Sequence, residues 1–77
     1  MADFPSLKAQ KLLRALQRKP LNYRVVAQSG SHRKLESDNW PEINFAWHDK
    51  ATIPPGAIRK LLVTKIGMTE EEAHDCL

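Results

Sequence analysis

Two turn signals in the middle of the chain constrain the fold more than any other feature. Ser29-Gly30 and Asp38-Asn39-Trp40-Pro41 are rich in residues that favour turns, and they separate three short segments with strand character. These segments are residues 23–28, 32–37 and 43–48. Because apolar and polar side chains alternate in the first and third segments, each is expected to bury one face. The sequence therefore predicts a three-stranded antiparallel sheet.

The segment before the sheet has helical periodicity. In residues 6–19, Leu12 and Leu16 fall on one side of a helix of about 3.6 residues per turn, and the cations fall on the other side. Ser6 is expected to cap the start of this helix, because its hydroxyl can accept a hydrogen bond from a backbone N–H of the first turn. Pro20 is expected to end it.

A second helix is expected after the sheet. It begins at Pro54-Pro55-Gly56, because proline is favourable in a first helical turn, and it ends at Gly67. Its predicted buried stripe consists of Ile58, Leu61, Leu62 and Ile66. Thr69 and Glu72 have the spacing of a capping box, which predicts a short helical turn over residues 70–76.

These segments together predict an α+β fold of the order αβββα, in which both helices cover one face of the sheet. A chain of 77 residues is too short for two independent cores, so residues 1–77 are expected to form one domain with its core in residues 6–67. Residues 68–77 are expected to be a short acidic tail. No apolar run is long enough to cross a membrane, the start of the chain lacks a signal-peptide pattern, and Cys76 is the only cysteine. We therefore expect a cytoplasmic protein without an internal disulfide.

Charge is distributed unevenly along the chain. Residues 1–69 contain all twelve lysines and arginines and five acids, a net charge of +7, whereas residues 70–77 contain four acids and reduce the total to +3. A body this basic suits a polyanion such as RNA. It suits equally a soluble protein whose surface happens to be basic, so charge alone leaves both interpretations open.

His32 is the residue best suited to chemistry. It lies in the run Gly30-Ser31-His32-Arg33-Lys34, between two predicted strands. Imidazole has an ordinary pKa near neutrality and can move protons, glycine allows a close backbone approach, and the two cations can hold a phosphate. RNA carries its own nucleophile, the 2′-hydroxyl, so a histidine with cationic support suffices for its cleavage. The alternative is a strand histidine that bonds a neighbour or contacts phosphate without catalysis.

Further cations are predicted to guide an RNA strand, although cationic stripes are more often the solvated faces of amphipathic helices. They are Lys11, Arg14, Arg18, Arg59, Lys60 and Lys65. His48 and Trp40 are candidate accessory contacts, Trp47 is expected in the core, and His74 and Cys76 are expected to have no role. The three histidines are far apart in sequence and no phosphate-binding glycine loop occurs, so neither a metal nor a cofactor is expected.

Three motifs in order resemble the HicA family of small mRNA-interferase toxins from bacterial toxin–antitoxin pairs. They are Gly30-Ser31-His32 after an aromatic-led strand, Trp47-His48 at the end of a later strand, and Pro55-Gly56 opening a helix with Ile58-Arg59-Lys60-Leu61-Leu62 before Gly67. The resemblance covers about residues 7–69. It implies a double-stranded-RNA-binding-domain-like fold and a metal-independent endoribonuclease that acts on mRNA without the ribosome. It also implies His32 as the catalytic residue and a HicB-type antitoxin as the partner that covers the site.

A binding module without catalysis is the alternative, either for RNA or for another protein. The basic body serves a nuclease and a binder equally, and only His32 argues for chemistry. In the nuclease interpretation, His32 acts as general acid, general base or both. The sequence predicts no particular oligomeric state.

Overall fold

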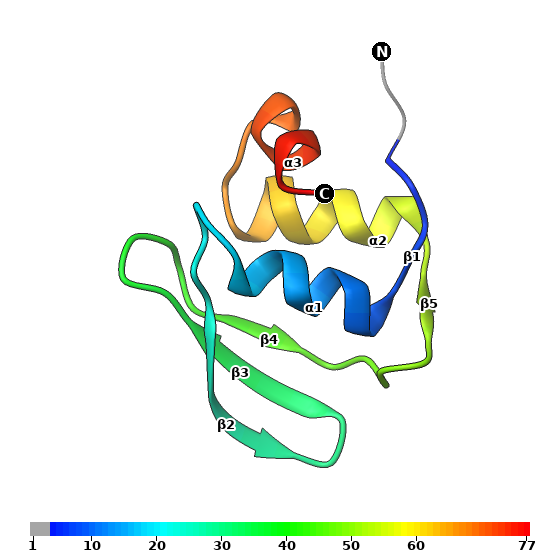
Figure 1. Cartoon of the computed structure of the whole chain (residues 1–77), viewed down its shortest axis with the longest axis vertical. Helices are drawn as coiled ribbons and strands as arrows, with labels where there is room; N and C mark the ends of the chain where they lie inside the picture. Colours follow the sequence, from blue (N-terminus) through cyan, green and yellow to red (C-terminus); the bar gives the residue numbers. More distant parts are fainter. Residues whose placement is uncertain (1–3) are drawn as a thin grey trace.

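The computed structural model describes residues 4–77, and its central feature is an antiparallel sheet of three strands (Figure 1). The strands lie in the order β2 (Arg24–Ser29), β3 (His32–Glu36) and β4 (Ile43–Phe45). The predicted α+β class and three-stranded antiparallel sheet are confirmed. The third strand is shorter than predicted, because it ends at Phe45 rather than at residue 48.

Helix α1 (Ala9–Gln17) shares one core with the sheet and with the helix that follows it. Leu12 of α1 is completely buried, and so are Leu35 of β3, Phe45 of β4 and Leu62 of the second helical segment. In Figure 1 the sheet occupies the lower part of the molecule, with α1 and α2 above it and α3 at the top. The apolar side of the sheet therefore faces the helices and the other side is open.

The start of α1 differs from the prediction, because Ser6 does not cap it. Leu7–Lys8 form a short strand, β1, which pairs antiparallel with β5 (Thr52–Ile53). The N–H of Ala9 in the first turn of α1 donates to the carbonyl oxygen of Ala51 at 2.8 Å. Since a partner distant in the chain satisfies this end of the helix, it starts without a side-chain cap.

Helix α2 (Pro55–Arg59) begins at the two prolines, as predicted, and continues directly as a π-helical turn, η1 (Lys60–Lys65). At the end of this turn the N–H of Ile66 donates to the carbonyl oxygen of Leu61, five residues back, at 3.0 Å. Gly67 then ends the segment with a φ of 92°, a left-handed conformation that glycine adopts without strain. The whole predicted stripe is buried, namely Ile58, Leu61, Leu62 and Ile66.

Helix α3 (Glu70–Cys76) starts with the predicted capping box. The N–H of Glu72 donates to Thr69 Oγ1 at 3.1 Å, and the N–H of Thr69 donates to Glu72 Oε1 at 3.0 Å. These two bonds satisfy backbone donors that a helix start would otherwise leave unpaired.

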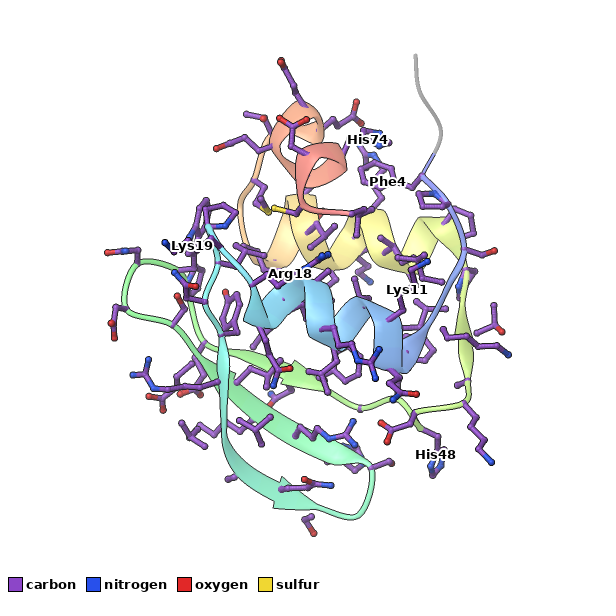
Figure 2. All side chains as sticks on the ribbon, viewed as in Figure 1. Phe4, Lys11, Arg18, Lys19, His48 and His74 are labelled. Atoms are coloured by element: carbon purple, nitrogen blue, oxygen red, sulfur yellow. The ribbon has the colours of Figure 1, made fainter. Side chains whose placement is uncertain are left out.

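The end of the chain belongs to the core, which corrects its interpretation as a tail. Ala73 is completely buried and Cys76 nearly so. The ring of His74 stacks on Phe4 with centroids 4.2 Å apart, and Figure 2 shows the two side chains together beside α3. The core thus extends past residue 67. His74 and Cys76 were expected to have no role, but both take part in packing.

Candidate functional site

A two-residue turn positions His32. Gly30 and Ser31 connect β2 to β3, so Ser29 faces His32 directly across the hairpin. Gly30 has a φ of 60°, as in the hairpin turns that place glycine at the first central position. A methyl group on Gly30 would meet no atom within 4 Å, so the requirement for glycine is conformational rather than steric.

His32 and Lys34 lie on one face of β3, because they are two residues apart, and both are exposed. Asn44 of β4 is the cross-strand partner of Lys34, and it is exposed between two buried residues. These three side chains therefore share the face of the sheet that is turned away from the helices. An open depression of about 230 Å³ on the sheet, termed here the His32 depression, is lined by Ala27, Gln28, Ser29, His32, Arg33, Lys34 and Asn44.

Lys34 is a cation that is available to bind a phosphate. Its Nζ lies 3.5 Å from Glu42 Oε1, and about half of each side chain is exposed. Exposed ion pairs of this kind contribute only about 0–1 kcal/mol. A phosphate at the His32 depression can therefore replace the carboxylate of Glu42 at little cost.

Arg33 lies on the other face of β3, and the structure does not bring its guanidinium beside Lys34. Only 13% of its side chain is exposed, and Nη2 is 2.8 Å from Asp49 Oδ1. Nη1 is buried and has no hydrogen-bond partner among residues 4–77. This arrangement fastens β3 to the segment after β4, so the guanidinium has a structural partner where the sequence predicted a phosphate contact.

Lys60 and Lys65 of η1 line a second cavity, of about 160 Å³, which has one lining residue in common with the His32 depression. Asn44 lines both hollows, and the remaining wall of the second cavity is Trp47, Ala57 and Leu61. Arg59 lines neither hollow and instead pairs through Nε with Glu70 Oε1 at 2.9 Å. Two of the three predicted cations in this region thus line a hollow that shares Asn44 with the His32 depression.

The cations of α1 are not brought to this face. Lys11 and Arg18 line a separate depression of about 370 Å³ together with residues from both ends of the described chain. Figure 2 shows both side chains along α1, away from the β2–β3 hairpin. Arg14 is exposed on the same helix and lines none of these hollows.

The two candidate accessory residues, His48 and Trp40, do not line the His32 depression. His48 is exposed in the segment between β4 and β5 and lines neither the His32 depression nor the second cavity (Figure 2). Trp40 is half-buried and packs against the core from its turn. Trp47 also packs against the core, as expected, but one side of it lines the second cavity. Asn44 was missed by the sequence analysis, although a strand that buries residues 43 and 45 must expose the residue between them.

Two groups with a raised pKa, Tyr23 and Cys76, lie outside the face of the sheet that carries His32. Burial raises the pKa of Tyr23 to about 12, and its hydroxyl donates to the carbonyl oxygen of Pro41 at 2.6 Å. Burial also raises the pKa of the Cys76 thiol, and nearby carboxylates add to the shift. A thiol with a raised pKa is a poor nucleophile, so Cys76 offers no rival to His32.

Metal binding and membrane insertion are two further properties on which the described residues bear. Among residues 4–77, no group of three or more histidine, cysteine, aspartate or glutamate side chains is arranged to hold a metal ion. None of the helices in the described part of the chain is long and apolar enough to cross a membrane. The chain matches no family model, no curated protein and no solved structure.

Proposed function

We propose that this protein is an endoribonuclease that cleaves mRNA on the open face of its sheet, as a HicA-type toxin of a toxin–antitoxin pair. The observation that carries the proposal is the exposed His32 at the start of β3, on the same face as Lys34. The turn fixed by Gly30 supports it, because acid–base catalysis needs a defined position for the imidazole. The proposal includes a double-stranded-RNA-binding-domain-like fold, action in the cytoplasm, and a HicB-type antitoxin that covers this face.

The proposed reaction takes its nucleophile from RNA. The 2′-oxygen attacks the adjacent phosphorus, a P–O2′ bond forms as the P–O5′ bond breaks, and the products carry a 2′,3′-cyclic phosphate and a free 5′-hydroxyl. His32 accepts the proton of the 2′-hydroxyl or donates one to the departing 5′-oxygen. Lys34 stabilises the charge that develops on the phosphoryl oxygens. Arg33 has no part in this step, because it is paired with Asp49 on the other face.

The test is incubation of a labelled single-stranded RNA in EDTA with the parent protein, His32→Ala and His48→Ala. We expect His32→Ala to lower the cleavage rate by about 10²–10⁴-fold, whereas His48→Ala keeps most of the activity because it lies outside the depression. A 2′-deoxy nucleotide at the cleavage site should block the reaction. Equal cleavage by the parent and His32→Ala would remove His32 from the mechanism.

A non-catalytic binding module is the second candidate, and strand β2 favours it. Every residue of this edge strand is exposed, including Val25 and Val26 at 38% and 45%. Exposed edge strands with apolar side chains pair readily with another chain. If the folded parent leaves RNA intact, salt separates the two kinds of binder. RNA binding weakens steeply with salt, whereas protein association through these valines persists.

A further inference from the structure

The cavity beside the His32 depression has the size and lining of a site for one nucleobase. It is half-open to solvent and has a volume of about 160 Å³. Cavities of about 150 Å³ in other proteins take up a benzene molecule, so this volume suits a single six-membered ring. The two fused rings of a purine need more room than such a ring does. A pyrimidine therefore fills the cavity, whereas part of a purine has to project from its open side.

The walls of the cavity provide both a stacking surface and a polar group. Trp47 is half-buried and presents an aromatic surface, and Ala57 and Leu61 complete the apolar wall. The amide of Asn44 is exposed and makes no side-chain hydrogen bond within residues 4–77. An amide carries both a donor and an acceptor, so it can complement the polar edge of uracil or of cytosine.

The π-helical turn brings two cations to the same cavity. In an α-helix, residues five apart project about 140° from one another around the axis. A π-turn instead bonds residues five apart, which places them one above the other. Lys60 and Lys65 are five apart at the two ends of η1, and both line the cavity. They are thus positioned to neutralise the phosphates that flank a bound base.

We propose that this cavity binds a pyrimidine base of single-stranded RNA, next to the nucleotide that is cleaved at His32. Trp47 stacks on the base, Asn44 bonds its edge, and Lys60 and Lys65 hold the neighbouring phosphates. From His32 to Asn44 the sheet spans two residues and one strand spacing, about 8 Å, which roughly one or two nucleotides can cover. This inference rests on the proposed function for the position of the cleaved bond, but base binding itself requires no cleavage.

The test is equilibrium binding of fluorescent RNA pentamers of uridine, cytidine and adenosine to the His32→Ala protein. We expect both pyrimidine pentamers to bind more tightly than the adenosine pentamer, because a pyrimidine fits within the cavity and meets the amide of Asn44, whereas stacking is available to every base. Adding Asn44→Ala should narrow this difference, and Trp47→Leu should lower the affinity for the pyrimidine pentamers by about 5- to 150-fold, which is the worth of stacking one base. Lys19→Gln is the control, because it removes an exposed cation outside the cavity and should weaken all three pentamers equally.

Ala57→Leu keeps the proposal testable if Trp47→Leu fails to fold. Ala57 is half-buried and lines the cavity, so the larger side chain fills the space without removing a core residue. We expect it to lower pyrimidine affinity and leave adenosine affinity unchanged. Equal binding of the three pentamers, or a difference that Asn44→Ala and Ala57→Leu leave intact, would overturn the pyrimidine site. A preserved difference in a parent protein that never cleaves RNA would instead overturn the nuclease and keep the site.

Discussion

The two outer strands of the sheet differ in what they give to the core. Two of the three residues of β4 are buried, whereas all six residues of β2 are exposed. Ile43 and Phe45 of β4 belong to the core that the helices share, and no residue of β2 does. Figure 1 shows β2 and its turn at the end of the molecule farthest from α3. One sheet thus combines a strand that stabilises the fold with a strand that is free to meet a ligand.

This difference separates two demands that usually compete in a small domain. A short chain has few residues with which to bury a core, so each core residue is costly to change. Side chains that contact RNA or a partner must stay in water until the ligand arrives. Because β3 lies between the two outer strands, it serves both demands, with Leu35 buried on one side and His32 and Lys34 exposed on the other.

The largest expected effect compares Phe45→Ala in β4 with Val26→Ala in β2. Phe45 is completely buried, so its truncation should lower the free energy of unfolding by about 3–5 kcal/mol. Val26 is 45% exposed, so its truncation should change that free energy by no more than about 0.5 kcal/mol. Urea unfolding monitored by circular dichroism measures both. Similar losses in the two variants would contradict the division between the strands.

An intermediate effect is expected where the exposed hairpin is fastened to the segment after β4. Asp49→Ala leaves the largely buried guanidinium of Arg33 without its carboxylate, which should cost about 1–3 kcal/mol of unfolding free energy. Arg33→Met leaves only the half-exposed carboxylate of Asp49 unpaired and should cost less. The same unfolding measurement ranks the two variants. A larger loss of unfolding free energy for Arg33→Met would mean that side-chain packing of Arg33, rather than its charge, joins β3 to the segment after β4.

The smallest effect concerns Tyr23, which precedes β2 and bonds Pro41 ahead of β4. Tyr23→Phe should lower the free energy of unfolding by about 0.5–1.5 kcal/mol at neutral pH, because the carbonyl of Pro41 loses its donor. The pKa of Tyr23 is raised to about 12 from 10.0, so the folded state favours the neutral phenol. Its stabilising contribution is therefore complete below pH 10 and is lost as the pH rises toward 12. The stability difference between parent and variant should shrink over this range, and a constant difference would show that the hydroxyl does not titrate with unfolding.

Local patterns predicted most of the fold, and distant contacts account for the errors. The capping box of Thr69 and Glu72 and the prolines at the start of α2 act within a few residues, so the sequence predicted them correctly. The start of α1 depends on the carbonyl of Ala51, which no local pattern around Ser6 reveals. Alternation also predicted that the first strand of the sheet buries one face, but all six residues of β2 are exposed, because a period of two cannot tell how far the helices reach along a strand.

The candidate site was predictable only in part for the same reason. The Gly30-Ser31 turn and the strand period place His32 and Lys34 on one face, and both could be read from the hairpin sequence. Asn44 joins them through the pairing of β3 with β4, which depends on register. Lys60 and Lys65 join through a π-turn that a plain helical wheel would not show. The sequence therefore predicted His32, Lys34, Lys60 and Lys65 as site residues, but it missed Asn44, which lines both hollows.

The π-helical turn also makes this part of the chain one residue longer than an α-helix would. The hydrogen bond from Ile66 to Leu61 spans five residues, where an α-helical bond spans four. A relative with an ordinary α-helix here would be one residue shorter between Leu62 and Gly67 and would keep the same core on either side. In an alignment, relatives without the π-turn would show a one-residue gap at this place. Such relatives would not hold two lysines on one side of the helix, as Lys60 and Lys65 are held here.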